Sequence, residues 1–313
     1  MQEQEDRDNA AYVRRVHDRG LTFDMRTMSR RRLLAALGGA SALALVGGAA
    51  GCDSTAEGQA AAAPGAGAAT GEVASETAGP YPADGSNGPD VRTEPGIVRG
   101  DIRSSFGTAT GTAEGVPLTF SLRVTDLDGA AVAGAAVYAW HCDRDGNYSL
   151  YSTGITEQNY LRGVQEADDT GTVTFTSIFP GCYAGRWPHI HFEVYRSLEN
   201  ATSGAGPIVK TSQIALPEDV AGAVYATDGY RASVANLSRV SLATDNVFGE
   251  DSAATELATV AGGVAEGYAA TLTIAIDPAG TETAGGGGPE GGGAPMGGGP
   301  MGSGPPGPRP SSS

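Results

Sequence analysis

Short runs of alternating apolar and polar residues, separated by turn residues, fill the middle of the chain. The run PLTFSLRVTDLDG at 117–129 alternates in this way and ends in an Asp-Gly turn. Similar runs follow at 135–143 (AAVYAWHCD), 171–178 (GTVTFTSI), 189–195 (HIHFEVY), 209–216 (VKTSQIAL) and 270–277 (ATLTIAID). Only PEDVAGAVYA at 217–226 predicts a helix, with a proline and acidic residues in its first turn. Because so few helices cannot cover a parallel sheet, the sequence predicts an all-β protein with a β-sandwich fold and few short helices.

The composition excludes several classes of protein. The chain of 313 residues contains 48 glycines and 18 prolines, which disfavours a mostly helical fold. Lys and Arg number 20 against 36 Asp and Glu, so the formal net charge is -16. Such an acidic chain repels phosphate backbones, and nucleic acid is therefore not expected as a partner. Three cysteines are too few for a disulfide scaffold or a zinc ribbon.

Residues 1–52 are expected to be an N-terminal extension that includes an export signal. Arginines in SRRRLL, at 29–34, precede an uncharged run at 33–51, and this order is typical of the twin-arginine signal. The alternative is a transmembrane anchor, because the run is long enough to span a bilayer. Twelve of its 19 residues are Gly or Ala, however, so the run is only weakly apolar and the export signal is favoured.

The sequence AAGC at 49–52 resembles the lipobox of bacterial lipoproteins, in which the cysteine carries the lipid. Cys52 is therefore the candidate lipidation site, although Ala49 stands where leucine is usual, so cleavage without lipidation stays open. We expect an exported, extracytoplasmic protein that is anchored to the membrane only through this N-terminal lipid.

The remaining chain divides by composition into a tether, a domain and a tail. Residues 53–75 are rich in Ala and Gly and predict a flexible linker, because they have almost nothing to bury. Residues 279–313 form a low-complexity Gly/Pro-rich tail that is expected to be disordered. Residues 76–278 are then a single domain, large enough for a proper core.

Two of the four histidines lie in GCYAGRWPHIHFEVY, at 181–195, separated by one residue. Because side chains alternate along a strand, His189 and His191 point to the same face and form half of a metal site. Glu193 lies on that face too and would complete a ferrous site of two histidines and one carboxylate. Tyr183 and Tyr148 offer phenolate oxygens instead, so the residues alone leave both sites open.

Several segments resemble the intradiol ring-cleavage dioxygenases, the family of catechol, hydroxyquinol and protocatechuate dioxygenases. They occur in the order of the family over about 76–250: AGPYP (78–82), RGDI (99–102), WHCDRDGNYS (140–149), GCYAGRWPHIHF (181–192) and KTSQIAL (210–216). A lone His-x-His motif is weak evidence, but the ordered set of motifs is specific. The resemblance implies a sandwich with an immunoglobulin-like core and a non-haem Fe(III) cofactor.

By position, the resemblance implies that the iron ligands are Tyr148, Tyr183, His189 and His191. Ferric iron is hard and prefers anionic oxygen donors to thiols. Two phenolates and a hydroxide would neutralise its three charges in a buried site, where net charge is unfavourable. Since the pKa of tyrosine is near 10, only a strong Lewis acid would hold both phenols ionised at ambient pH.

The implied reaction is the cleavage of a catechol-type aromatic diol by O2 between its two hydroxylated carbons, giving a muconate-type diacid without nicotinamide or flavin. In this reading Tyr183 is displaced by the substrate and takes up a substrate proton. Arg186 matches the arginine that stabilises negative charge on the ring. Gln213 and Tyr81 match a glutamine behind the site and an aromatic residue at the cavity rim, so both are assigned to substrate binding.

Other readings stay open from the sequence. The domain could be an extracytoplasmic surface module that binds an aromatic compound or a sugar without turnover, or a ferrous oxygenase that uses Glu193. A homo-oligomer is compatible with either. His141 is expected to be a structural hydrogen-bonding residue. Because an exported protein meets an oxidising compartment, a disulfide between Cys142 and Cys182 is a further hypothesis.

Overall fold

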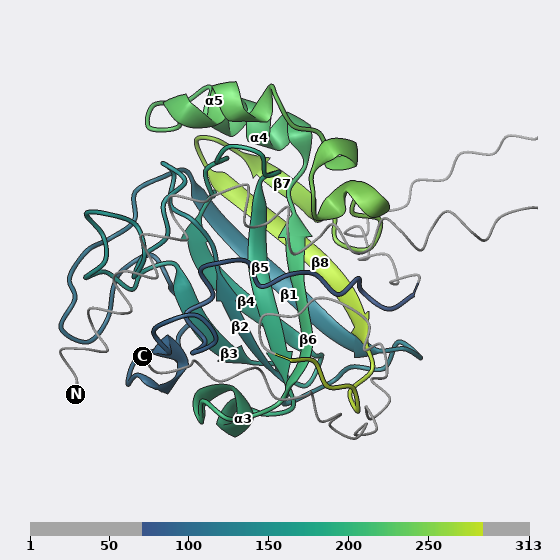
Figure 1. Cartoon of the computed structure of the whole chain (residues 1–313). Helices are drawn as coiled ribbons and strands as arrows, with labels where there is room; N and C mark the ends of the chain where they lie inside the picture. The colour runs from purple at the N-terminus through teal and green to yellow at the C-terminus, as the bar shows by residue number, and fades with distance from the viewer. Residues whose placement is uncertain (1–70, 284–313) are drawn as a thin grey trace, which may run out of the picture.

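The computed structural model describes residues 71–283, and in that range two four-stranded β-sheets pack against each other (Figure 1). The strand orders are β4-β1-β8-β7 and β3-β2-β5-β6. The strands are β1 (Pro117–Asp126), β2 (Ala136–Trp140), β3 (Arg162–Glu166), β4 (Thr172–Ile178), β5 (His189–Tyr195), β6 (Ile208–Ala215), β7 (Thr259–Gly263) and β8 (Gly267–Ile276). The predicted all-β sandwich is confirmed, and each predicted strand run overlaps one of these strands.

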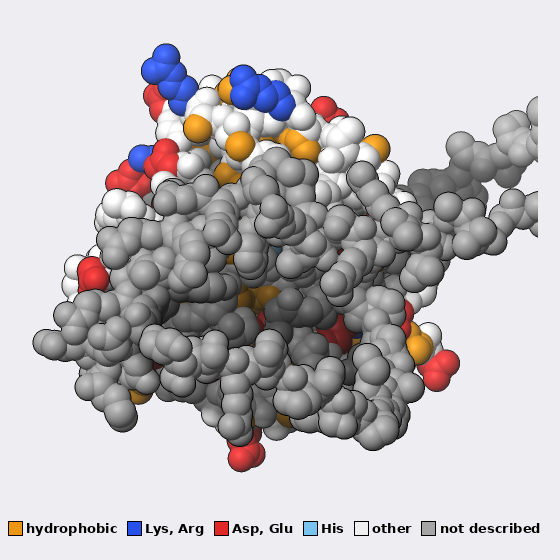
Figure 2. Space-filling view, in the orientation of Figure 1, with side chains coloured by type: hydrophobic (Ala, Val, Ile, Leu, Met, Phe, Trp, Pro, Cys, Tyr) orange, Lys and Arg blue, Asp and Glu red, His pale blue; other side chains and the backbone are white. Residues whose placement is uncertain are grey.

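The helices are short and lie outside the two sheets. They are α3 (Leu198–Thr202), α4 (Glu218–Tyr225) and α5 (Arg231–Leu237), with 3-10 turns η3 (Val91–Thr93), η4 (Leu242–Thr244) and η5 (Phe248–Glu250). The predicted helix at 217–226 is α4. Helices α4 and α5 cap one end of the sandwich (Figure 1), and exposed basic side chains gather at that end (Figure 2).

The main hydrophobic core lies between the sheets, where alternate residues of each strand meet. In β1, Leu118, Phe120 and Leu122 point into this core, while the residues between them are partly or fully exposed. Phe120 stacks on Phe175 of β4 with ring centroids 5.1 Å apart. This burial of every second residue is the physical origin of the alternation in the sequence.

Strand β5 differs because all seven of its residues are buried. Ile190, Phe192 and Val194 belong to the core between the sheets. His189 and His191 therefore point to the opposite face of their sheet. A second apolar cluster, which includes Trp140 and Tyr148, covers part of that face. The histidines consequently lie in a buried layer that is separate from the main core.

An N-terminal strap, residues 76–84, crosses this second face in front of the strands (Figure 1). Gln213 of β6 donates from Nε2 to the Thr77 carbonyl at 2.8 Å. Tyr138 of β2 donates its hydroxyl to the Pro82 carbonyl at 2.7 Å. These bonds pair buried backbone carbonyls of the strap, and they hold the AGPYP segment over the histidines.

Residues on the far side of both boundaries expected from composition make hydrogen bonds with the sandwich. Val73, within the expected linker, is buried and donates its N–H to the Ala275 carbonyl at 2.8 Å. Glu282, within the expected tail, donates its N–H to the Ile208 carbonyl at 2.7 Å. The export signal, Cys52 and the rest of the tether and tail lie outside the described residues. Within residues 71–283, no helix has the length and apolar character needed to cross a membrane.

Candidate metal centre

Two histidine nitrogens face each other in the buried layer under the strap. The Nε2 atoms of His189 and His191 are 3.0 Å apart, and both residues are only 2% exposed. Nδ1 of His189 lies 2.5 Å from the Trp187 carbonyl. That carbonyl can only accept a hydrogen bond, so Nδ1 carries the proton and Nε2 presents its lone pair to His191. The strand geometry thus aims at least one imidazole lone pair into the shared space.

Both predicted tyrosines reach the same space from two different loops. The Tyr183 hydroxyl is 3.2 Å from Nε2 of His189. The Tyr148 ring packs 5.9 Å from the Tyr183 ring and 6.2 Å from the His191 ring, between centroids. The buried Tyr148 hydroxyl approaches Tyr183, but it has no partner in hydrogen-bonding geometry among the described residues. The structure therefore brings together all four side chains that the resemblance placed on the iron.

A glycine in the DRDGN turn lets the two tyrosine loops meet. Gly146 has φ +85°, and a Cβ at this position would lie 3.1 Å from the Cβ of Tyr183. The Asp143 carboxylate accepts the Asn147 N–H at 2.9 Å and so shapes the same turn. Ser152 then accepts the Tyr148 N–H through its hydroxyl at 2.9 Å. Tyr148 is thus held by its turn on one side and by Tyr183 on the other.

Burial sets the protonation of these donors. It lowers the pKa of His189 and of His191 well below the usual 6.5, and the nearby Arg186 charge lowers both further. Burial also raises the pKa of the Tyr148 phenol well above 10. The imidazoles are therefore neutral and ready to act as ligands, whereas the Tyr148 phenol keeps its proton until a strong cation displaces it.

Glu193 does not complete a carboxylate-based site. Its Oε2 accepts the Tyr195 hydroxyl at 2.5 Å, and its charge environment is set by Asp84 and Arg92 rather than by the histidines. No group of three or more His, Cys, Asp or Glu side chains suited to a metal occurs within residues 71–283. The ferrous alternative is therefore wrong in its geometry, and Glu193 is instead a fully buried acid bonded to Tyr195.

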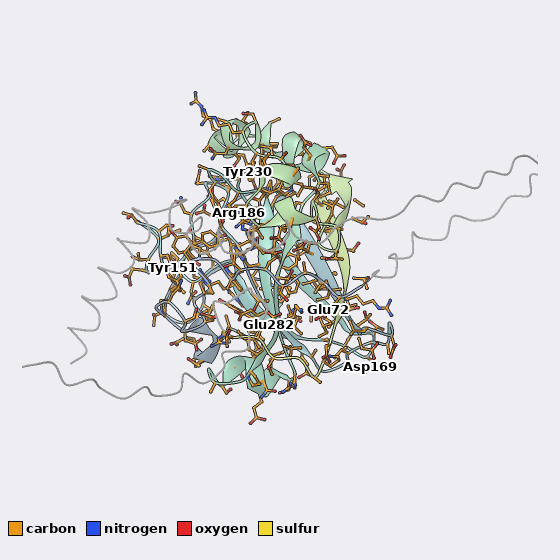
Figure 3. The ribbon with its side chains drawn as sticks, turned by 45° about the vertical axis from the view of Figure 1, so that its right-hand side comes forward. Glu72, Tyr151, Asp169, Arg186, Tyr230 and Glu282 are labelled. Atoms are coloured by element: carbon orange, nitrogen blue, oxygen red, sulfur yellow. The ribbon has the colours of Figure 1, made fainter. Side chains whose placement is uncertain are left out.

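Arg186 lies beside the four rings and is anchored on two sides. Its Nε donates to Oδ2 of Asp245 at 3.0 Å, and its Nη2 donates to Oε1 of Gln213 at 2.6 Å. Figure 3 shows Arg186 in the interior, beneath the end of the domain that carries Tyr230. Gln213 therefore contacts the guanidinium of Arg186, and its part in substrate binding stays a prediction. Asp245 was missed, because no motif in the sequence around it marks it.

Tyr81 of the strap packs against Tyr148, with ring centroids 5.0 Å apart. The Tyr81 carbonyl accepts a hydrogen bond from Nη2 of Arg162 at 3.0 Å, and the same nitrogen donates to the Ser149 carbonyl at 3.0 Å. Arg162, which is 1% exposed, thus ties the strap to the loop that carries Tyr148. The sequence did not predict the role of Arg162, since RGVQE lacks the alternation of apolar and polar residues that indicates a strand.

His141 and the two cysteines play structural parts. The Nε2 of His141 bonds with the Ser177 hydroxyl at 2.7 Å, and burial lowers the His141 pKa to about 4, as expected for a neutral structural histidine. Cys142 and Cys182 are both free and buried. Each thiol points at a different backbone carbonyl, on Gly181 and Arg186, at 3.4 Å. The disulfide hypothesis is therefore wrong in this structure.

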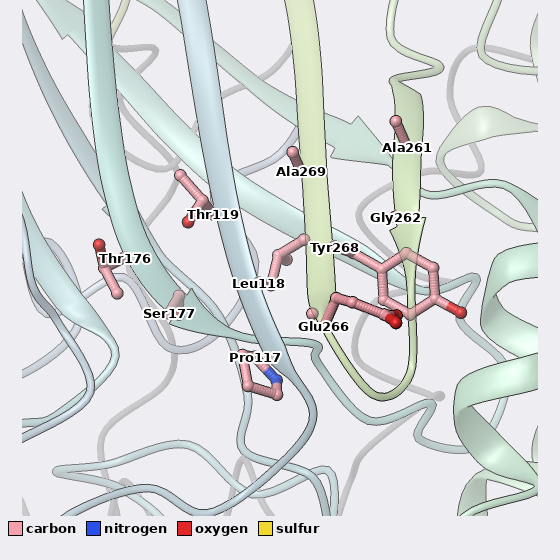
Figure 4. Close-up of a pocket in the computed structure, with 11 residues that line it drawn as sticks. Pro117, Leu118, Thr119, Thr176, Ser177, Ala261, Gly262, Glu266, Tyr268 and Ala269 are labelled. Carbon is pink, nitrogen blue, oxygen red and sulfur yellow. The ribbon is translucent and has the colours of Figure 1, made fainter.

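A surface hollow of about 360 Å³ lies elsewhere, at one end of the sheet β4-β1-β8-β7 (Figure 4). Its lining includes Thr119, Thr176, Glu266 and Tyr268 and none of the predicted site residues. With one carboxylate among mostly apolar and hydroxyl side chains, this hollow does not offer a second donor set for a metal.

Comparisons with known proteins find similarity to dioxygenases. Residues 88–198 match a family model described as Dioxygenase. Chlorocatechol 1,2-dioxygenase of Rhodococcus opacus is 36% identical over 66 residues, covering 21% of this chain and 26% of that enzyme. The 6-chlorohydroxyquinol 1,2-dioxygenase of Cupriavidus pinatubonensis is 33% identical over 100 residues, covering 26% of this chain and 36% of that enzyme. The chain thus spans about a quarter to a third of the length of these curated relatives.

A solved structure extends the comparison to the whole domain. An intradiol ring-cleavage dioxygenase from Tetranychus urticae superposes with a TM-score of 0.54 and 23% identity, covering 67% of this chain and 97% of that chain. The fold is therefore that of the intradiol ring-cleavage dioxygenases. The described domain therefore shares the fold of these enzymes, and the match of residues 88–198 to the dioxygenase family model supports the predicted resemblance.

Proposed function

We propose that the domain is a non-haem Fe(III) intradiol dioxygenase, which cleaves a catechol-type diol with O2 between its hydroxylated carbons to give a muconate-type diacid. The observation that carries this proposal is the convergence of four donors. Two imidazole Nε2 atoms lie 3.0 Å apart, one phenol lies 3.2 Å from the first nitrogen, and a second, buried phenol has no hydrogen-bond acceptor. Unpaired polar atoms in a buried site are unfavourable unless a ligand satisfies them.

The donor set fits ferric iron better than the common alternatives. Zinc sites in proteins use thiolates, carboxylates or a third histidine, and ferrous sites use a carboxylate beside two histidines; none of these further donors lies among these four rings. Tyr148, Tyr183, His189 and His191 would hold the metal, with the phenolates offsetting its charge. A ferric ion bound there would supply Lewis acidity that favours deprotonation of the diol, and the deprotonated ring is more electron-rich and so more reactive toward O2.

The two tyrosines differ in burial, which suits them to different roles. Tyr148 is 2% exposed and packed among three aromatic rings, so it has little room to move. Tyr183 is only partly buried and precedes the exposed residues Ala184 and Gly185. We therefore assign to Tyr183 the swing away from the site, and to its phenolate oxygen the acceptance of a proton from the diol. Tyr148 stays in place.

The Arg186 guanidinium supplies a fixed positive charge next to the position of the diol ring. It is 3% exposed and held by two hydrogen bonds, so it need not reorient as negative charge develops. One pre-oriented donor of this kind lowers a barrier by roughly 3 kcal/mol in comparable sites. The strap and Tyr81 cover the same region and exclude bulk water from it.

The test is oxygen uptake by the iron-loaded protein with catechol, protocatechuate and hydroxyquinol. We expect one O2 consumed per diol, and loss of most activity in Tyr148→Phe and in Tyr183→Phe. Tyr225→Phe is the matched control, because Tyr225 is equally buried but donates its hydroxyl to the Pro180 carbonyl away from the rings. Stoichiometric binding of a diol without oxygen uptake would overturn the proposal in favour of a surface binding module.

We also propose that the protein works outside the cytoplasm. The twin-arginine route carries folded proteins, which suits a metal that is inserted before export. The variant Cys52→Ala lacks the proposed lipid attachment site. Retention of this variant at the cell surface would contradict the lipid anchor. Release of the same variant into the medium would support it.

A further inference from the structure

Asp245 is a buried acid outside every motif discussed above, and it contacts the guanidinium beside the proposed metal site. It lies between η4 and η5, and its side chain has no exposed area. Oδ2 accepts hydrogen bonds from Nε of Arg186 at 3.0 Å and from the Trp187 N–H at 2.7 Å. Oδ1 accepts the N–H groups of Val247 at 2.8 Å and Phe248 at 3.0 Å. One carboxylate thus joins two segments of chain.

The two oxygens have separable functions. Oδ1 receives only backbone N–H groups of its own segment, which is an ordinary turn-stabilising arrangement. That function needs a neutral acceptor and no charge. Oδ2 faces a cation and the backbone immediately before Pro188 and His189. Backbone N–H groups stabilise the buried carboxylate in part, and Arg186 supplies the positive charge that pairs with it.

The guanidinium is thereby fixed in its plane. Asp245 holds Nε and Gln213 holds Nη2, while the Phe248 ring lies under the group, with its centroid 5.9 Å from Cζ of Arg186. Gln213 is itself held by the Thr77 carbonyl of the strap. An arginine side chain otherwise samples many rotamers, and its electrostatic value in a site depends on being oriented before the reaction.

We propose that Asp245 is the positioning residue of Arg186: it does not touch the substrate but sets the orientation of the guanidinium toward the diol. The inference rests on the proposed function, because Arg186 matters for turnover only if a diol reacts there. It adds to that function a residue that the helical end of the domain supplies to the site.

The experiment is a double-mutant cycle with Asp245→Asn, Arg186→Ala and the double variant. Asparagine keeps the size of the side chain and a neutral acceptor for the turn, but its amide NH2 group removes the charge that pairs with Arg186 and the oxygen that accepts the Trp187 N–H. Asp251→Asn is the matched control, since Asp251 is an exposed acid of the same segment that accepts only the Ala253 N–H, at 2.9 Å.

For turnover per bound iron, we expect Asp245→Asn to lose about tenfold, the lower end of what removal of a supporting hydrogen-bond partner does at metal sites. In the Arg186→Ala background the same substitution should change the rate less than about twofold, because the residue through which it acts is gone. Asp251→Asn should match the wild type. Equal losses with and without Arg186 would overturn the inference.

Two readouts separate this inference from the proposed function. Catechol affinity of the iron-loaded proteins, measured without oxygen, should show the same non-additivity even if the wild type does not turn over. In denaturant unfolding of the metal-free proteins, the double variant should be at least as stable as Arg186→Ala, because Asp245→Asn removes a stranded buried charge. Additive effects in both measurements would leave Asp245 a purely structural acid and overturn its positioning role. Absence of oxygen uptake alone would contradict the proposed reaction but not the positioning role of Asp245.

Discussion

Gly79, in the AGPYP segment of the strap, lies against the imidazole ring of His191. It has φ +70°, a left-handed conformation that L-residues rarely adopt. A Cβ built there would lie 3.3 Å from Cε1 of His191 and 3.8 Å from its Nε2. Gly79→Ala therefore adds a methyl group against the ring that is expected to bind the metal.

The expected loss of folding stability in Gly79→Ala has two parts. Placing alanine in the left-handed region costs about 1–2 kcal/mol of folding stability. The second part is the contact, which is tighter than ordinary packing. His191 cannot retreat freely, because Trp140 stacks on its ring at 5.0 Å between centroids with only 3° between planes. Overpacking of this kind typically adds about 1 kcal/mol or more.

Gly107 supplies the matched control. It has φ +68°, and a Cβ there would meet no atom within 4 Å. Gly107→Ala therefore carries the backbone term alone. In thermal unfolding of the metal-free protein both variants should lose stability, with Gly79→Ala losing more, at about 2–4 °C per kcal/mol for a domain of this size.

Iron affinity, measured by competition with a chelator, separates the two variants further. Gly79→Ala should bind iron about tenfold more weakly, a loss usual for a displaced ligand environment, and Gly107→Ala should bind like the wild type. Equal stability losses together with equal iron affinities would refute the reasoning, because the contact with His191 would then carry no energy.

Three further outcomes are expected. Burial and the neighbouring Asp84 raise the pKa of Glu193 from 4.5 to about 8. Between these two pH values Glu193 is protonated in the folded state and ionised in the unfolded state. This contribution makes the metal-free protein less stable as pH rises from about 4.5 to 8, and Glu193→Gln should flatten that slope while leaving iron binding nearly intact. An unchanged slope, or loss of iron, would contradict this assignment. If Tyr148 and Tyr183 bind as phenolates, iron uptake releases their two protons, and iron affinity rises with pH. Calorimetry in buffers of different ionisation heat should show about two protons released per metal. A measurement of zero released protons would refute phenolate binding. Titration of the unfolded, unreduced protein should find Cys142 and Cys182 as free thiols, and their absence would restore the disulfide.

The strands with a clear alternation were predictable from sequence, and those without it were not. HIHFEVY gave the bounds of β5 directly, since its β-branched and aromatic residues favour a strand. Strand β3 begins with the buried Arg162, and β7 (TVAGG) is Gly-rich and mostly exposed, so neither follows the usual pattern. Helix α5 was missed because it is short and stabilised by packing rather than by a strong local signal.

The four proposed ligands could be inferred because they lie in motifs with fixed spacing. Their surroundings could not. Asp245 contacts Arg186 across 59 residues, and Trp140 reaches His191 through the pairing of β2 with β5. Glu193 shows the limit of periodicity. Alternation placed it on the correct face, but the partners that decide its role, Tyr195 and Asp84, are set by tertiary structure.

The visible absorption spectrum of the iron-replete protein tests the central claim most directly. Phenolates bound to ferric iron give a charge-transfer band, so the wild type should be coloured. Tyr148→Phe and Tyr183→Phe should each weaken or shift the band, and the double variant should lose it while Tyr225→Phe keeps it. A colourless iron-replete wild type, or an unchanged band in the double variant, would contradict ligation by these two tyrosines.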